Sequence, residues 1–231
     1  MSAMPTLFTY VMPYDGGSAP NPYWGICTLV ICKPKIRLHA EVGDWIVGTG
    51  ATHARVTDRE VKDLSGRVIY AMRVTEKMTM QEYDAHTREQ LPSKIPDWFN
   101  RDWCRRVGDS IYDFTTAEPK QRKSVHDERA VKRDLSGEYA LLSQDFYYFG
   151  DQAIPLPDDL APVIAKTQGH RSNANGPYLD RFVAWIRGLG CESGTVAGEP
   201  IYRRFRVGRQ QENAARGEPS RGASRASCGT S

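Results

Sequence analysis

The stretch that decides the fold is YWGICTLVIC (residues 23–32). Its last seven residues, ICTLVIC (26–32), form a continuous apolar run rich in β-branched side chains, which is typical of a buried strand. The preceding DGGSAPNP (15–22) combines two glycines, two prolines and an asparagine, so it indicates a loop. Pro34 then begins a short predicted helix over 34–40. We therefore expect a loop, a core strand and a short helix in succession.

Further strands and helices follow from hydrophobic spacing. Strands are predicted over LFTYVM (7–12), VGDWIVGT (42–49), RVIYAMRV (67–74) and YALLSQDFYYF (139–149). A helix is predicted over 79–91, where Thr79 and Glu82 form a capping box. Another is predicted over 177–189, where apolar residues recur at helical spacing. This order predicts an α+β fold with a small, strongly bent mixed sheet or β-barrel and flanking helices.

The charge of the chain is unevenly placed. The net charge is +3, but residues 203–231 alone hold seven Arg and two Glu, which is +5 and leaves −2 for the rest. This excludes a generally basic nucleic-acid-binding fold. The final residues are rich in Arg, Gly and Ser, so we expect disorder after about residue 208. The predicted division is a domain over 1–190 and a tail over 191–231, with a charged, exposed stretch over 117–137.

Several classes of protein are excluded by missing patterns. No run of about 18 apolar residues is present, and the first residues lack a secretory signal pattern, so a cytoplasmic protein without a membrane partner is predicted. Neither a CxxC nor a metal-binding histidine spacing occurs, so we expect no metal site. Neither GK[ST] nor GxGxxG occurs, so we expect no cofactor.

The loop and core strand at 15–37 hold the first candidate binding residues. The amide of Asn21 can read a base edge, Trp24 can stack on a base, and Lys33 or Arg37 can hold a phosphate. The alternative is a proline-rich turn that leads into a core strand. In that case Trp24 is a core aromatic and the two cations are solvated.

Two short motifs supply further candidates. GTG (48–50) ends a predicted strand with small residues, where a ligand can approach the backbone near Thr49. GDSIY (108–112) holds Asp109, a candidate general acid or base, and Tyr112, a further nucleotide-binding candidate. The alternative for GDSIY is an ordinary turn before a strand. Since neither GxSxG nor HExxH is present, whether the protein is an enzyme stays open.

Several of these motifs, taken in order, resemble a known family. YDGGSAPNPYWGICTLVICKPKIR (14–37), VGDWIVGTG (42–50), GRVIYAMRVTEKMTMQEY (66–83), GDSIY and DFYYFG (145–150) are similar to the nucleotide modification associated domain type 2 family. The resemblance spans about residues 10–186. It implies association with modified nucleotides, in phage-related or mobile DNA modification and restriction systems.

A second similarity concerns architecture. The short helix, the V-G-D turn and the strand over 67–74 are similar to PUA-like domains, EVE domains among them. Those are small bent β-barrels, several of which read a modified base in an aromatic-lined pocket. This similarity implies one pocket that gathers Asn21, Tyr23, Trp24, Lys33, Arg37 and Thr49.

The leading functional hypothesis is binding or processing of a modified nucleotide or base, in DNA. Trp24 or Tyr23 would stack on the base, Asn21 and Thr49 would read its edge, and cations would hold phosphate. Its partners would be the modified nucleotide or DNA, together with DNA-modification or phage-defence proteins. One alternative is an enzyme that acts on a modified nucleotide through Asp109. Another is a non-catalytic protein-partner module of such a system.

Overall fold

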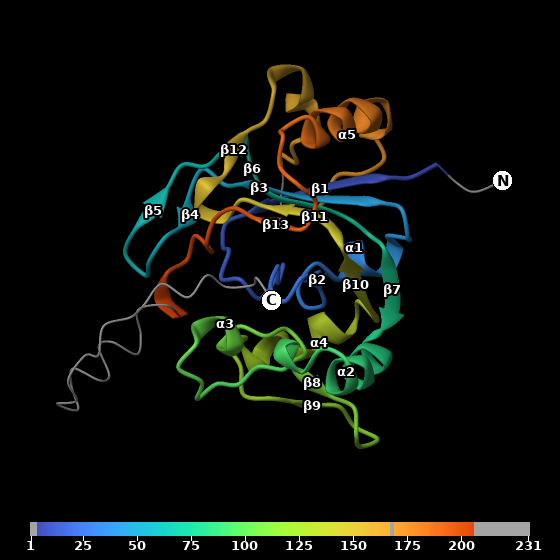
Figure 1. Cartoon of the computed structure of the whole chain (residues 1–231), viewed down its shortest axis with the longest axis vertical. Helices are drawn as coiled ribbons and strands as arrows, with labels where there is room; N and C mark the ends of the chain where they lie inside the picture. Colours follow the sequence, from blue (N-terminus) through green and yellow to red (C-terminus); the bar gives the residue numbers. More distant parts are fainter. Residues whose placement is uncertain (1–3, 167–168, 206–231) are drawn as a thin grey trace.

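The computed structural model describes residues 4–166 and 169–205, which form two sheets that enclose a shared core (Figure 1). The larger sheet has the order β1 (Leu7–Met12), β3 (Trp45–Gly50), β6 (Arg67–Arg73), β11 (Asp145–Tyr148) and β13 (Thr195–Val196), and β12 (Ile154–Pro155) also pairs with β6. The smaller sheet has the order β2 (Cys27–Leu29), β10 (Tyr139–Ser143) and β7 (Glu76–Thr79). Two short pairs complete the strands: β4 (Ala54–Arg55) with β5 (Val61–Lys62), and β8 (Tyr112–Asp113) with β9 (Lys120–Gln121).

The helices take different places on the two sheets (Figure 1): residues 179–187 cover the outer face of the larger sheet and residues 80–89 and 131–135 that of the smaller sheet, whereas residues 34–39 pack on the shared core and residues 103–106 join a separate cluster with Tyr23. They are α1 (Pro34–His39), α2 (Met80–Glu89), α3 (Trp103–Arg106), α4 (Val131–Leu135) and α5 (Leu179–Arg187). Single 3-10 turns lie at η1 (Pro92–Lys94), η2 (Glu128–Ala130), η3 (Gly150–Gln152), η4 (Asp158–Val163) and η5 (Gly176–Tyr178). The predicted capping box is present, since the Thr79 hydroxyl accepts from the Glu82 N–H and the Glu82 carboxylate accepts from the Thr79 N–H. The three predicted helices are confirmed within two residues at each end.

Alternating side chains explain why both faces of these strands are buried. In β10, Leu141 enters the core between the sheets, whereas Ala140 and Leu142 lie on the opposite face, in the cluster that contains Met80 and Tyr83 of α2. In the larger sheet, Val47 and its neighbours face α5 and η4. Because successive strand residues point to opposite faces, a strand covered on both sides reads as a continuous apolar run.

The two sheets are joined by chain that bends from one into the other, and their described strands do not close into a barrel. β6 leads directly into β7, and β10 into β11, so two lengths of chain pass from one sheet to the other. β1 and β3 are parallel, whereas β3 and β6 are antiparallel. The α+β class with a mixed sheet is therefore confirmed. The described strands form no closed barrel, and the PUA-like barrel is not confirmed.

The core strand is shorter than predicted. Of residues 23–32, only Cys27–Leu29 form β2, and the chain reverses at both ends with positive φ, +68° at Trp24 and +59° at Cys32. Lys33 follows at +41°. Apolar content predicted burial correctly here, but burial continues through Val30 and Ile31 after strand pairing has ended.

The outer edge of β1 is closed by a distant segment. The backbones of Thr9 and Arg171 exchange two hydrogen bonds of 2.8–2.9 Å, and the Asn175 amide donates to the Leu7 carbonyl. β13 pairs with β11, and Ile201 lies in the shared core. The predicted disorder after residue 208 lies outside the described residues. Within them, no helix has the length and apolar character needed to cross a bilayer.

Close contact at Gly50 gives a test of the fold. A Cβ there would overlap the carbonyl oxygen and the Cβ of Leu64, and both residues are buried. We expect Gly50→Ala to lower the free energy of unfolding by about 1–3 kcal/mol through overpacking, as measured by urea denaturation. Gly176→Ala is the matched control, because its Cβ would enter open space. Equal stability of the two variants would contradict this packing.

Candidate functional site

Two of the predicted site residues, Asn21 and Asp109, belong to one buried polar network around Lys94. The Lys94 ammonium lies 2.7–3.0 Å from the Asn21 carbonyl and side-chain oxygens, the Ile26 carbonyl and the Thr28 hydroxyl. The Asn21 amide nitrogen donates to the Val107 carbonyl at 3.0 Å. The Asn21 side chain therefore has internal partners for both its donor and its acceptor.

Asp109 is held from two sides within this network. Its carboxylate accepts from the Thr28 hydroxyl at 2.6 Å and from the Tyr83 hydroxyl at 2.7 Å. Burial raises the pKa of Asp109, and the nearby Lys94 charge opposes that rise. Burial also lowers the pKa of Lys94 to about 8. The Thr28 hydroxyl links the two charges, because it accepts from the Lys94 ammonium and donates to the Asp109 carboxylate. Both side chains are fully buried. Because a general acid or base must lie within hydrogen-bond reach of its substrate, the complete burial of Asp109 counts against proton transfer from this carboxyl.

Arg37 and Tyr112 meet in a second network around Asp134 of α4. The Arg37 guanidinium donates to the carbonyls of Cys32, Tyr139 and Asp134, and burial lowers its pKa to about 10. The Tyr112 hydroxyl donates to Asp134 Oδ2 at 3.1 Å. Arg37 is completely buried, so the expectation that it is a solvated cation does not describe it.

The same network corrects the prediction that residues 117–137 are exposed. Asp134 is fully buried, and Ala130 is nearly so, although Glu128 and Arg129 are exposed. Asp134 Oδ1 also accepts from the Cys32 N–H, and Oδ2 lies 2.6 Å from His126 Nε2. Among the described residues, Cys32, His126 and Asp134 are the one group whose donor atoms lie close enough together to hold a metal ion.

Lys33 and Thr49 lie on either side of Tyr10. The Lys33 ammonium sits 4.2 Å from the centre of the Tyr10 ring, and the Thr49 hydroxyl donates to the Tyr10 carbonyl at 3.2 Å. Burial lowers the pKa of Lys33. Thr49 is fully buried, so its side chain is committed to holding β3 against β1.

Tyr23 and Trp24 lie against α3, and the Tyr23 N–H donates to the Asn21 side-chain oxygen of the Lys94 network at 3.4 Å. The Tyr23 and Trp103 rings are perpendicular, with 5.5 Å between their centres. The Arg105 guanidinium lies 5.9 Å from the centre of the Trp24 ring. The indole nitrogen of Trp24 is buried and has no hydrogen-bond partner within the described chain. Asp102 caps this helix through the Cys104 N–H.

More aromatic and basic side chains adjoin α3. Lys123 lies 4.8 Å from the Phe99 ring centre and 5.9 Å from that of Trp98. The Asp97 N–H donates to the Arg105 carbonyl, which joins this segment to α3. Phe99 is 69% exposed. We call this set the aromatic–basic cluster: Trp24, Trp98, Phe99, Trp103, Arg105 and Lys123.

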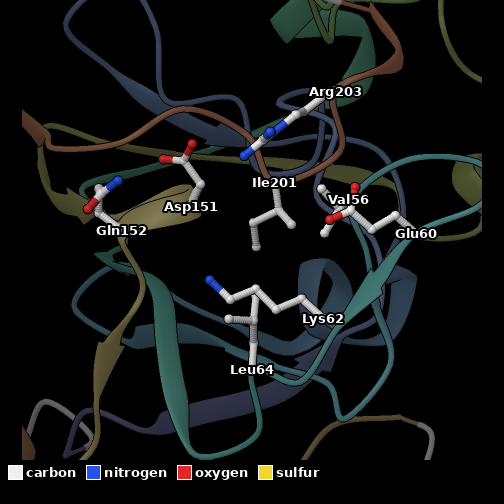
Figure 2. Close-up of a pocket in the computed structure, with 8 residues that line it drawn as sticks. All are labelled: Val56, Glu60, Lys62, Leu64, Asp151, Gln152, Ile201 and Arg203. Atoms are coloured by element: carbon white, nitrogen blue, oxygen red, sulfur yellow. The ribbon is translucent and has the colours of Figure 1, made fainter.

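A separate cavity of about 420 Å³ lies between the β4–β5 hairpin and the chain after β13 (Figure 2). It is lined by Val56, Glu60, Lys62, Leu64, Asp151, Gln152, Ile201 and Arg203. Figure 2 shows the charged ends of Lys62 and Arg203 directed toward the same space. Its size suits a small ligand, but none of its lining side chains is aromatic and none is a predicted site residue.

The predicted site residues are thus divided among four places: the Lys94 network, the Asp134 network, the surroundings of Tyr10 and the aromatic–basic cluster, which contains Trp24 and against which Tyr23 packs through Trp103. Sequence reasoning singled out neither Lys94 nor Lys123. The segment WFNRDWCRRVGDSIY (98–112) does mix aromatic and charged residues, and that mixture is the signal that could have directed attention to the cluster.

Comparison with known proteins gives one match. A family model described as nucleotide modification associated domain 2 matches residues 4–207. The search of curated proteins and the search of solved structures found nothing similar enough to count as a match.

Proposed function

Because the chain belongs to the nucleotide modification associated domain 2 family, whose name places it in a nucleotide modification context, we propose that it binds a modified nucleotide or base in DNA at the aromatic–basic cluster. The family membership confirms the resemblance carried by motifs from YDGGSAP to DFYYFG. The observation that carries the choice of site is the grouping of four aromatic rings with Arg105 and Lys123 around α3.

The aromatic rings suit stacking on bases. Each base presents a π-face that stacks on an aromatic side chain, with about 1–3 kcal/mol lost per base when that side chain is removed. Phe99 is largely exposed, and Trp24 and Trp98 are half-buried. Trp24 has a positive φ, a backbone conformation that residues other than glycine rarely adopt. Such outliers concentrate at functional sites.

The cations suit phosphate binding. Lys123 is exposed and Arg105 is half-buried, and each lies over an aromatic ring where a nucleotide phosphate would approach a stacked base. The neighbouring Asp97 and Asp102 carboxylates accept hydrogen bonds from the Phe99 and Cys104 N–H groups. These acidic groups are thereby engaged in turn and cap formation, and Arg105, which donates to the Pro92 carbonyl at 3.2 Å, is held beside Trp24.

The test is binding of short single-stranded DNA that carries a hypermodified pyrimidine, compared with the unmodified strand. We expect Phe99→Ala and Trp24→Ala each to weaken binding by about 1–3 kcal/mol, which is about 5- to 150-fold, through loss of stacking. Fluorescence anisotropy at several salt concentrations measures the effect and separates stacking from phosphate attraction.

Matched variants control for surface hydrophobicity and charge. Val42 is 60% exposed, and Lys35 is exposed on α1, so Val42→Ala and Lys35→Ala should leave affinity unchanged. If Phe99→Ala binds as tightly as Val42→Ala, the aromatic–basic cluster is not the site. Equal affinity for modified and unmodified strands would instead show that the protein does not recognise the modification.

A further inference from the structure

A cysteine, a histidine and an aspartate from separate parts of the chain converge beside α4. Cys32 lies just after β2, His126 lies between β9 and η2, and Asp134 lies in α4. One donor atom from each residue lies within 4.8 Å of the others. From this convergence we propose that Cys32, His126 and Asp134 bind a Zn²⁺ ion, with a non-protein ligand in the fourth position.

The orientation of His126 supports a shared ligand. Its Nε2 atom is buried and lies 2.6 Å from Asp134 Oδ2. Burial alone would raise the pKa of Asp134, but the two groups are close enough for an ion pair that helps to lower it below its usual value. Nε2 makes no well-aligned hydrogen bond within the described chain. A buried ring nitrogen without such a bond is rare. A cation bound by both atoms would give the nitrogen a partner, and its binding would move Nε2 and Oδ2 apart, because tetrahedral ligands each about 2.0–2.2 Å from Zn²⁺ are separated by more than the present 2.6 Å.

Neighbouring groups hold the proposed ligands in place. The Cys32 N–H donates to Asp134 Oδ1 at 2.9 Å, and the Tyr112 hydroxyl donates to Oδ2 at 3.1 Å. The Gln121 amide donates to the His126 carbonyl at 3.2 Å. Such outer contacts orient metal ligands in known metal sites.

The donor set selects the metal class. A thiolate, an imidazole and a carboxylate are all ligands that Zn²⁺ accepts, and three protein ligands leave its fourth tetrahedral position open. The sulfur disfavours Mg²⁺ and Ca²⁺, which take oxygen ligands. The backbone φ of Cys32 is +59°, an unusual conformation of the kind that concentrates at functional sites.

A Cys–His–Asp nucleophile is the competing arrangement, and the geometry disfavours it. In such a triad the aspartate orients the imidazole by accepting a well-aligned hydrogen bond, which His126 does not make with Asp134.

The experiment uses the full chain with ZnCl₂ and CoCl₂ as probes. We expect one tightly held Zn²⁺ per chain after gel filtration, and a thiolate-to-cobalt charge-transfer band with Co²⁺. Cys32→Ser should abolish that band, and Cys32→Ser or His126→Asn should weaken Zn²⁺ binding on the order of 100-fold, since even outer-contact mutations cost 10- to 100-fold.

Matched controls are present in the chain. Cys191 is also a free, half-buried thiol, and His53 is exposed, so Cys191→Ser and His53→Asn should bind Zn²⁺ as the unaltered chain does. Zn²⁺ should protect Cys32, but not Cys191, from alkylation by iodoacetamide in peptide mass spectra. A cobalt complex without the thiolate band, or Zn²⁺ affinity of Cys32→Ser equal to that of Cys191→Ser, would overturn the proposal. Rapid alkylation of Cys32 regardless of Zn²⁺ would overturn it in favour of a nucleophile.

Discussion

Replacing Lys94 with methionine is expected to lower the free energy of unfolding by about 3–5 kcal/mol, the usual cost of removing one member of a buried charge network. The Lys94 ammonium satisfies four oxygen atoms in a fully buried place. Methionine has a similar length but no donor, so all four oxygens lose the ammonium as a donor. The Asp109 carboxylate loses the positive charge that opposes the rise of its pKa. Urea denaturation at neutral pH measures the loss.

The pH dependence of this variant separates electrostatics from packing. Without Lys94, the pKa of buried Asp109 rises further above its usual range. A carboxyl whose pKa is higher in the folded chain binds a proton more readily there than in the unfolded chain, so lowering the pH stabilises the folded state. The difference in free energy of unfolding between Lys94→Met and the unaltered chain should therefore shrink as the pH falls from 7 toward the ordinary aspartate pKa, about 4. Lys35→Met, at an exposed position, should lie within about 0.5 kcal/mol of the unaltered chain. If the free energy of unfolding of Lys94→Met is lower by the same amount at every pH, the variant has lost packing alone.

Alkaline solution is expected to unfold the protein steeply above pH 10. Among the buried tyrosines, four are at most 1% exposed: Tyr10, Tyr70, Tyr83 and Tyr148. Burial raises the pKa of each phenol well above its usual value of 10. Above pH 10 the unfolded chain releases these protons and the folded chain retains them, so stability falls as pH rises. Each group contributes about 1.4 kcal/mol per pH unit, and four together about 5 kcal/mol per pH unit.

Lys94 acts in the opposite direction over a lower range. Its pKa is lowered from 10.5 to about 8 in the folded chain, so the unfolded chain binds more protons between these values and stability rises with pH there. One group cannot offset four tyrosines above pH 10. Phenolate absorbance and far-UV circular dichroism, followed together from pH 8 to 12, should change in one transition. Phenolate formation by these four tyrosines in a chain with native circular dichroism would contradict the expectation. Removing two of the hydroxyls in Tyr10→Phe/Tyr70→Phe, which are 2.8 Å apart, should reduce the slope.

Local patterns predicted the elements better than the contacts between them. Proline at Pro34 and the Thr79 capping box are short-range signals, and the helices begin where those signals lie. The strand over 23–32 was predicted too long because apolar residues signal burial, and burial here extends beyond strand pairing. The bending of the sheets depends on β6 and β10 continuing into the opposite sheet, which hydrophobic spacing does not encode.

The candidate site was harder to predict because its polar residues depend on distant partners. Asn21 has the side chain of a base reader, but Lys94, 73 residues away, takes its oxygen. Cys32 and Asp134 are 102 residues apart, so spacing rules for metal ligands could not join them. The stacking role predicted for Trp24 and Tyr23 stays a prediction. The structure adds neighbouring aromatic and basic side chains from α3 and its flanking segments to that hypothesis.

The closure of β1 by residues 171 and 175 has a consequence for how the chain folds as it is synthesised. The hydrogen bonds between Thr9 and Arg171 join residues more than 160 positions apart. At a synthesis rate of about 5–20 residues per second, the edge of β1 waits roughly 8–32 seconds for its partner. Contacts this distant in sequence also form slowly, because a long loop must close first. During that interval the first strand to be made presents an open edge, which is the kind of surface that chaperones protect and that other nascent chains can pair with.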